Sequence, residues 1–351
     1  MSRLPFNLQC PVPLEGHDTV QMAHGGGGRW MRALIESVFL PAFGGPGPRR
    51  PPHDSAVIEI GETRLAFTTD TFVVSPLVFP GGDIGKLAVY GTVNDLAMAG
   101  ARPSWLSAGF VLEEGLPMET LRRIVESMRL AADEVGAAIV TGDTKVVDRG
   151  KGDGVFINTA GIGLIPPGIE ISPARVVAGD AVLVSGDLGR HGIAIMSVRE
   201  GLRFEGALPS DCGSLAGLVE ALVAAGVALH CLRDLTRGGL AAATNEIALD
   251  ARVGIELDEP AIPVSAPVAG ACELLGLDPL YVANEGRLVA FVPAAAAEQA
   301  LQVMRGHPAA SQPAIIGRVT ASHPGSVQLR GALGGERILD LLSGEQMPRI
   351  C

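Results

Sequence analysis

Residues 79–103 read FPGGDIGKLAVYGTVNDLAMAGARP, and this stretch decides the fold class that the sequence predicts. From Gly85 to Gly100 it has the pattern of a helix that is closed by a glycine. Short apolar runs that are typical of strands flank it, at residues 56–60, 64–69, 106–112 and 155–165. Helix and strand patterns therefore alternate, and the first half of the chain predicts an α/β domain.

The rest of the chain predicts a second α/β unit. A helical face spans residues 121–135 and stops at Gly136, and Pro166-Pro167-Gly168 then marks a boundary before further strand and helix patterns. We expect four segments in all. They are a flexible Gly/Pro-rich N-terminal segment (1–50), a first domain (51–167), a C-terminal α/β domain (168–342) and a mobile tail (343–351).

Composition excludes several classes of protein. The 27 basic and 38 acidic residues give a net charge of −11 without a basic stripe, which argues against nucleic acid as a partner. No apolar leader is visible, and the longest apolar stretch, Leu215–Leu229, is interrupted by Glu220 and is too short to span a membrane. The five cysteines show no CxxC spacing, so a disulfide framework or zinc site is not expected. We expect a cytoplasmic protein.

Glycines and aspartates form the first candidate ligand site. The 46 glycines cluster beside Asp, Asn and Thr, notably at 24–28 and 237–239, where backbone amides could approach phosphates. Asp70 is expected just past one strand, Asp143 just past another, and Asp95 inside the glycine-bounded helix. Such carboxylates suit a Mg-nucleotide site. Taken singly, each aspartate could equally be a helix cap or a turn former.

The last residue, Cys351, is the second candidate. A terminal thiol on a tail that contains Pro348 is expected to be exposed, and an exposed free thiol is a liability unless it is used. A prenylation signal would need the cysteine four residues from the end, so that class is excluded. A reactive tail and a chance terminal cysteine remain as alternatives at this point.

The order of motifs points to one family. The chain resembles the HypE family of hydrogenase maturation factors, within the aminoimidazole ribonucleotide synthetase superfamily of ATP-binding proteins. The polyglycine at 25–28 departs from the serine-containing run that is usual in that family. The resemblance rests on HGGGG (24–28), TTDTF (68–72), residues 79–103, GFVLEEGLPMETL (109–121), VTGDTKVV (140–147), INTAGIG (157–163), DLTRGGL (234–240), CELLGLDPL (272–280), ANEGRL (283–288) and PRIC (348–351).

The resemblance implies an ATP-dependent carbamoyl dehydratase. The implied fold has two α/β (α+β) domains of the aminoimidazole ribonucleotide synthetase type and a mobile C-terminal tail. The first domain is expected to bind ATP and to dimerise through its sheet. The implied reaction dehydrates a carbamoyl group on the terminal thiol to a thiocyanate, a source of cyanide for the iron of nickel–iron hydrogenase. The implied partners are a second copy, the carbamoyltransferase HypF as donor and a HypC–HypD complex as acceptor.

The resemblance also implies site residues. The catalytic set is Cys351 with Lys145 and Glu285 as proton-handling groups, although either of these two could be a structural ion-pair partner. ATP and Mg²⁺ are the implied cofactors. The metal set is Asp70, Asp95 and Asp143. The ATP-binding set is Asp70, Asp95, Gly142, Asp143, Thr144, Asn158, Asp234, Arg237 and Gly238.

Two other interpretations share these aspartates. A selenophosphate synthetase would be expected to carry a reactive Cys or selenocysteine in the 24–28 loop, which has none, and neither it nor a thiamine-phosphate kinase accounts for PRIC at the end of the chain. A non-catalytic nucleotide-binding scaffold for hydrogenase maturation would bind ATP without releasing phosphate. Single-turnover phosphate release would separate an enzyme from a scaffold.

Overall fold

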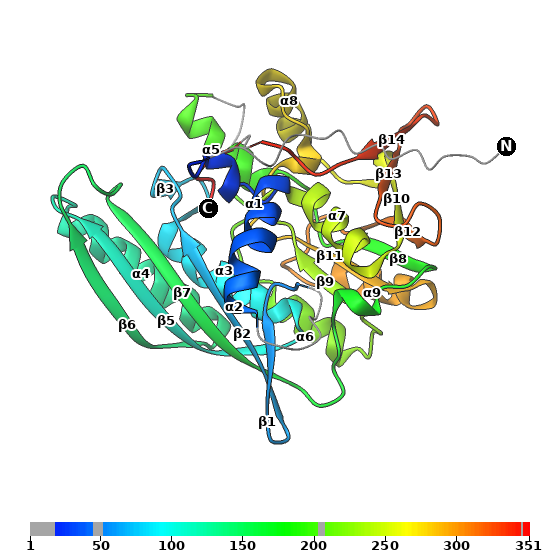
Figure 1. Ribbon diagram of the computed structural model, residues 1–351, viewed down its shortest axis with the longest axis horizontal. Coiled ribbons are helices and arrows are strands. Elements are labelled where there is room, and N and C mark those ends of the chain that lie inside the picture. The colour runs from blue at the N-terminus through cyan, green and yellow to red at the C-terminus, as the bar shows by residue number, and fades with distance from the viewer. Residues whose placement is uncertain (1–17, 45–51, 203–207, 345–346) are drawn as a thin grey trace.

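Two β-sheets, one from each half of the chain, organise the fold (Figure 1). The computed structural model describes residues 18–44, 52–202, 208–344 and 347–351. The first sheet has the strand order β1-β2-β7-β5-β6, and the second has the order β14-β13-β10-β12-β8-β11-β9. Helices separate and cover the sheets, which confirms the expected mixed α/β class.

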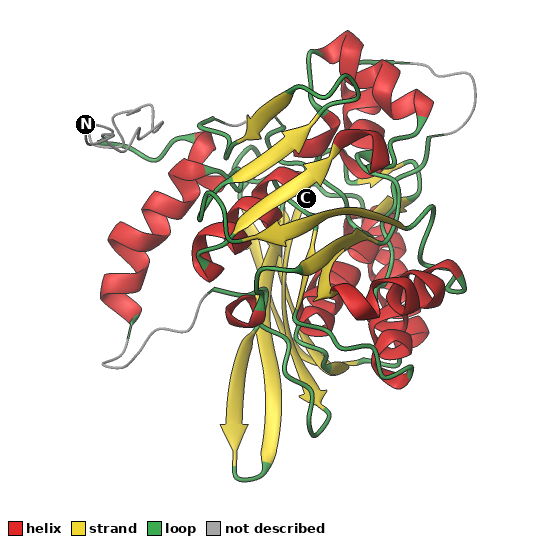
Figure 2. Ribbon diagram, turned by 90° about the vertical axis from the view of Figure 1, so that its right-hand side faces the viewer, coloured by secondary structure: helices red, strands yellow, loops and turns green. Residues whose placement is uncertain are grey.

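The first sheet is mostly antiparallel. Its strands β5 and β6 are parallel, and helix α4 connects them, as a parallel pair requires. Strands β1 and β2 form the expected hairpin around Gly61-Glu62, and the hairpin extends beyond the body of the molecule in Figure 2. The elements are β1(Ala56–Ile60), β2(Thr63–Phe72), β3(Val78–Phe79), β4(Gly82–Asp83), α3(Ile84–Met98), β5(Arg102–Glu113), α4(Met118–Val135), β6(Ala138–Val147) and β7(Val155–Ile165).

Helix α3 is the stretch on which the sequence argument began, and it lies between the two halves. Asp83 caps it by accepting hydrogen bonds from the backbone N–H groups of Gly85 and Lys86 at 2.8 and 3.0 Å. Nearly all of its residues are buried, because the helix packs on β2 and β7 on one side and on β9 and α6 on the other. Any side chain on its central turns is therefore placed at the junction of the two halves.

The second half wraps helices around the seven-stranded sheet. Strands β10 and β13 pair in parallel, and the other pairs are antiparallel. The short helices are η3(Pro173–Arg175), η4(Glu259–Ala261), η5(Pro279–Tyr281) and η6(Ala294–Ala296). The main elements are β8(Asp180–Val184), α5(Arg190–Arg199), α6(Ala216–Ala224), β9(Cys231–Asp234), α7(Gly239–Ala251), β10(Gly254–Asp258), α8(Ala266–Leu275), β11(Leu288–Pro293), α9(Ala297–Arg305), β12(Ala314–Thr320), β13(Val327–Arg330) and β14(Glu336–Leu339).

A helical segment precedes the first sheet. After η1(Met22–Gly25), the chain forms α1(Arg29–Leu34), η2(Ile35–Phe39) and α2(Leu40–Phe43) in direct succession. Arg32 pairs with Asp250 of α7 at 3.2 Å, so this segment is anchored to the second half. The described part of the N-terminal segment, for which we expected flexibility, is thus largely helical. The stretches rich in glycine and proline on both sides of this helical segment dominate the composition of residues 1–50, so the composition does not reveal the helix.

Two expected strand ends were wrong. Asp70 lies inside β2, paired with Thr159, because β2 continues to Phe72. Asp143 likewise lies inside β6 rather than after it. Both strands continue through a run of polar residues, because the hydrogen bonds between strands join backbone groups and do not require an apolar side chain.

No helix within the described residues combines the length and apolar character of a membrane span.

Candidate active site

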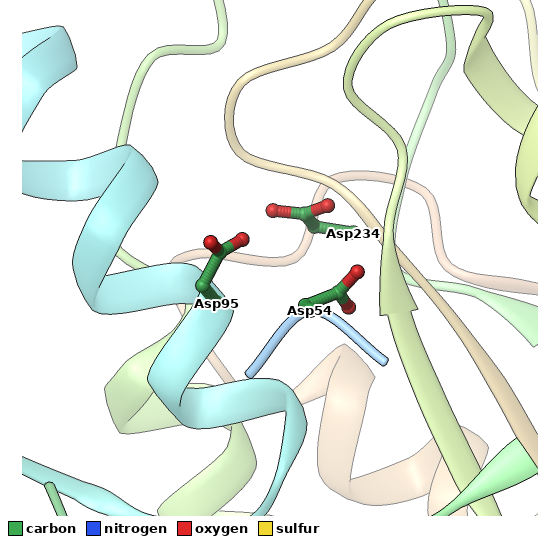
Figure 3. Close-up of side chains that lie close together, drawn as sticks. All are labelled: Asp54, Asp95 and Asp234. Carbon is green, nitrogen blue, oxygen red and sulfur yellow. The ribbon is translucent and has the colours of Figure 1, made fainter. Parts of the chain in front are cut away.

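Three carboxylates meet at the junction of the two halves (Figure 3). Asp95 projects from α3, Asp234 ends β9, and Asp54 stands just before β1. Each offers an oxygen, and these three oxygens lie within 4.8 Å of one another. The Thr68 hydroxyl donates to Asp95 at 2.8 Å, and the Arg233 guanidinium pairs with Asp54 at 3.0 Å. The cluster is held by elements from both sheets.

The electrostatics of this cluster favour a bound cation. Burial, and then repulsion from the neighbouring carboxylates, raises the pKa of Asp95 and of Asp234 well above the usual carboxyl range. Burial raises the pKa of Asp54 to about 6, although Arg233 opposes the shift. Asp54 Oδ2 is also buried and has no hydrogen-bond partner among the described residues. Clustered carboxylate oxygens, one of them buried without a hydrogen-bond partner among the described residues, fit a hard divalent cation such as Mg²⁺.

Asp70 and Arg237 extend this cluster into a cavity. Asp70 lies on the same face of β2 as Thr68, and its charge contributes to the raised pKa of Asp95. The cavity measures about 270 Å³, and both Asp70 and Arg237 line it beside the three clustered carboxylates. The structure therefore brings together four of the predicted ligand-binding residues, Asp70, Asp95, Asp234 and Arg237.

The two glycine clusters also meet at this cavity. Gly27 has φ +73°, and a Cβ there would lie 2.7 Å from the carbonyl oxygen of Arg237. Gly238 has φ +77°, and its Cβ would lie 2.6 Å from that of Ala242. Both positions therefore require glycine, for conformation and for close approach. The Arg237 guanidinium donates to the Gly25 carbonyl at 3.2 Å and thereby ties the two loops together.

Glu285 is buried, with 3% of the residue exposed, and it interacts electrostatically with Asp234, Asp70 and Arg237. Its Oε1 has no hydrogen-bond partner in the described part of the chain. Burial, followed by the charges of Asp234, Asp70 and Asp211, raises its pKa well above the usual range, and Arg237 opposes the shift. A carboxylate in such a setting binds a proton strongly, which suits a group that removes one from a substrate.

The terminal residue lies in the same region. Cys351 is half-buried, and it lines a small cavity together with Arg237, Gly238 and Thr71. Its carbonyl oxygen accepts a hydrogen bond from the backbone N–H of Val73 at 3.0 Å. The charge of Cys351 is the main cause that raises the pKa of the Arg237 guanidinium, ahead of Asp70 and Glu285. Arg237 thus faces the terminal cysteine, Asp70 and Glu285.

The remaining predicted residues lie elsewhere in the chain. Gly142, Asp143, Thr144 and Lys145 lie on β6, the exposed edge strand, where Lys145 pairs with Asp143 and keeps 68% of its side chain exposed. Asn158 of β7 donates to Thr69 and Thr71 on the sheet face turned away from α3. The strand register connects Asp70 of β2 to Gly142 of β6 across the two intervening strands, through Thr159 and Ala108. Three strand spacings, roughly 14 Å, therefore separate Asp70 from Gly142. Within one chain these residues do not join the carboxylate cluster.

Comparison with known proteins identifies the family. Family models for the AIR synthase related protein match residues 52–165 with the N-terminal domain and residues 177–330 with the C-terminal domain. A protein of Azotobacter vinelandii named carbamoyl dehydratase HypE is 54% identical over 333 residues, which cover 95% of this chain and 97% of that protein. The chain belongs to the HypE family. The resemblance drawn from the motifs is confirmed, together with the fold and the class of enzyme.

Two solved HypE structures have the same fold. One, described as a HypE–HypF complex, gives a TM-score of 0.83 at 46% identity and covers 88% of this chain and 100% of that chain. The other, described as HypE in complex with ATP, gives a TM-score of 0.80 at 48% identity and covers 95% of this chain and 100% of that chain.

Sequence inspection missed Asp54. Asp54 follows PPH and precedes a strand, so it lacks the glycine and threonine neighbours that drew attention to the other aspartates. Two further residues, His191 and Arg199, contact the C-terminal tail. Nothing in their local sequence signals that role, because their partners lie about 150 positions away in the chain.

The carboxylate cluster predicts a pH-dependent response of the protein to Mg²⁺. The carboxyl pKa values of the cluster are raised in the fold, so the metal-free folded protein retains protons that the unfolded chain releases. The contribution of these carboxyl groups to the free energy of unfolding is therefore fully present below about pH 4 and is lost as the pH rises. Mg²⁺ relieves the repulsion once the protons have left. We expect the Mg²⁺-induced rise in Tm, measured against EDTA, to grow from pH 5 to pH 8. An equal rise at both pH values would contradict the assignment.

Proposed function

We propose that this protein uses ATP to dehydrate a carbamoyl group on the Cys351 thiol to a thiocyanate, which supplies cyanide for nickel–iron hydrogenase maturation. The observation that carries the proposal is the position of the terminal cysteine. Cys351 lines a small cavity together with Arg237, and Arg237 also lines the neighbouring cavity that holds the carboxylates. The names of the relatives support the reaction class, and the ATP complex of a HypE protein supports the co-substrate.

The reaction balances without a further reagent. The carbamoyl oxygen of the S-carbamoyl group attacks the γ-phosphorus of ATP, and ADP leaves. One N–H proton then passes to Glu285 and the other to the departing phosphate as the C–O bond breaks. The nitrogen and carbon form a triple bond, so the products are a thiocyanate, ADP and phosphate. The carbamoyl oxygen by itself is a poor leaving group, and its phosphorylation allows it to leave as part of phosphate.

Residues of this chain have separate parts in the proposed reaction. Asp54, Asp95 and Asp234, with Asp70 beside them, would hold Mg²⁺, which neutralises charge on the transferring phosphoryl group when it is bound. Arg237 would stabilise negative charge between the phosphate and the tail. Glu285 would accept an N–H proton, because its buried carboxylate has a high proton affinity. The glycine loops allow the backbone to approach the phosphates closely.

The residues on β6 would act in a second copy of the chain. The open face of the first sheet, which is turned away from α3, exposes Phe67, Trp105, Val111 and Leu164. An apolar face on a soluble protein favours an interface between copies, and a self-complementary dimer is the commonest solution. Lys145 and Asn158 lie on this same face. In the proposed dimer, Gly142, Asp143, Thr144, Lys145 and Asn158 would contribute to the partner's ATP site.

This arrangement predicts that two inactive variants complement each other. Lys145→Ala and Glu285→Gln should each accept the carbamoyl group yet form little thiocyanate. When the two variants are co-expressed with different tags and the mixed dimer is isolated, one site would hold both an intact Lys145 and an intact Glu285, so part of the activity should return. A mixed dimer that stays inactive would place both residues in one chain's site, and wild-type yields in both variants would remove them from the mechanism.

Two macromolecular partners complete the proposal. HypF would deliver the carbamoyl group, which the HypE–HypF complex of a relative supports. A HypC–HypD complex would take the cyano group. Both transfers require the thiol to reach the protein surface, whereas dehydration requires it at the cavity.

A single-turnover experiment tests the function. The protein is incubated with HypF and its carbamoyl donor, freed of both, and then given Mg-ATP. The C-terminal peptide should gain a carbamoyl group and then lose the mass of one water, while an equal amount of phosphate appears. Phosphate release without this loss would indicate another ATP-using reaction. Persistence of the carbamoyl adduct, with ATP bound and no phosphate released, would indicate a non-catalytic scaffold.

A further inference from the structure

The end of the chain docks along residues 73–75 through backbone hydrogen bonds. The backbone N–H groups of Val73 and Ser75 donate to the carbonyls of Cys351 and Arg349, at 3.0 and 3.4 Å. Ile350, between them, is 4% exposed and belongs to the core at the junction of the two halves. The tail therefore occupies a defined seat, with a buried anchor one residue before the reactive thiol.

Arg199, at the end of α5, holds two carbonyls of the tail. Its Nη1 donates to the Pro348 carbonyl at 2.6 Å, and its Nη2 donates to the Arg349 carbonyl. Its Nε donates to the Ser75 carbonyl at 2.7 Å, on the segment that receives the tail. One guanidinium thus bridges the tail and its seat, and hydrogen bonds from a charged donor are among the stronger ones.

His191, at the start of the same helix, holds the next carbonyl. Its Nε2 lies 2.8 Å from the Ile350 carbonyl oxygen, and its Nδ1 lies 2.8 Å from the Ser210 hydroxyl. A carbonyl only accepts, so Nε2 carries the proton and Nδ1 accepts from Ser210. The ring is fully buried and packs edge-on against Phe79. Burial lowers the pKa of His191, which favours the neutral ring that this pattern needs.

We propose that His191 and Arg199 form a tail clamp that positions Cys351 for dehydration and restrains it from carbamoylation. The inference rests on the proposed function, because it assigns the two residues opposite effects on the two half-reactions. Both are positioning residues, since they hold the backbone of the tail rather than the thiol. The clamp sets the fraction of time that the thiol spends at the cavity and the fraction that it spends at the surface.

The clamp predicts a faster reaction of Cys351 with alkylating reagents when it is broken. Arg199→Gln and His191→Ala should each raise the rate at which iodoacetamide modifies Cys351 in the free protein, by roughly 10-fold or more. His191→Gln, whose amide can still donate to the Ile350 carbonyl, should stay closer to the wild type. A glutamate-specific protease that cleaves after Glu345 releases QMPRIC for mass analysis. Arg64→Gln is the matched control, because Arg64 donates to the Ile169 carbonyl, which is not part of the tail.

Single-turnover rates provide the readout that a merely structural role would not produce. In Arg199→Gln and His191→Ala, carbamoylation by HypF should become faster, while the dehydration of the purified carbamoylated protein by Mg-ATP should become slower. A fall in both rates together, or alkylation at the wild-type rate in both variants, would overturn the clamp. If the proposed function itself were wrong, the wild type would form no thiocyanate, yet the contrast in alkylation would persist.

Discussion

Replacement of Cys351 by alanine is expected to abolish carbamoylation of the protein while ATP binding remains. The thiol is the proposed acceptor, whereas the carboxylate cluster and Arg237 lie on other elements and do not depend on it. The backbone carbonyl of residue 351 can still accept from Val73, so the tail should still dock. Intact mass measures the adduct, and equilibrium binding of a fluorescent ATP analogue measures the site.

Cys272→Ala serves as the control for this variant. Cys272 is buried in α8, and burial raises the pKa of its thiol to about 11, so it should not act as a nucleophile. Carbamoylation of this control should match the wild type. A carbamoyl adduct on any other cysteine of the Cys351→Ala protein would refute the assignment of the acceptor.

Replacement of Asp95 by asparagine is expected to have opposite effects on turnover and on stability. Loss of one carboxylate should reduce Mg-ATP turnover by roughly 100-fold or more, because charge on the phosphoryl group is then less well neutralised. The same change removes a charge that Asp234, Asp54 and Asp70 repel, so the metal-free protein should melt a few degrees higher. The asparagine oxygen can still accept from Thr68, which keeps the local structure in place.

Asp258→Asn is the matched control for Asp95. Asp258 pairs with Arg330 on the outer part of the second sheet, so its loss should change neither turnover nor the Mg²⁺ response. Calorimetry with EDTA and with Mg²⁺ measures stability, and phosphate release measures turnover. Unchanged turnover in Asp95→Asn would show that Asp95 is structural, and a lower Tm without metal would show that its charge is not repelled in the fold.

The sequence predicts the fold class, and it singles out several residues that the fold brings together at the candidate site, for reasons that are local. Helix α3 has its cap at Asp83 and its glycine stop at Gly100, and hairpin β1–β2 has its turn at Gly61. These signals act over a few residues, so the pattern alone can reveal them. The motif around Asp234 and Arg237 is similarly compact. The terminal position singles out Cys351, and the family resemblance adds Glu285.

The missed parts depend on contacts between distant segments. Asp54 becomes a cluster member only because β1 and β9 bring it beside Asp234, which is 180 positions away in the numbering. The docked tail depends on α5, and no periodicity near Ser343 could have predicted that seat. Asp143 and Lys145 lie on the edge strand β6, where their proposed role depends on a second copy of the chain, and a local sequence pattern carries no signal for such a contact.

The attachment of the tail has a consequence for reaction order. Arg29 donates its backbone N–H to the Leu342 carbonyl at 2.9 Å, so even when residues 348–351 leave their seat the chain stays attached nine residues before the thiol, within about 30 Å of extended chain. A tether of this length keeps the carbamoyl group at an effective concentration in the millimolar range, whatever the dilution of the protein. Dehydration should therefore be first order in protein. A free carbamoylated peptide would need millimolar concentrations to compete with the tethered tail for the site. The total rate of thiocyanate formation would be proportional to the amount of carbamoylated protein.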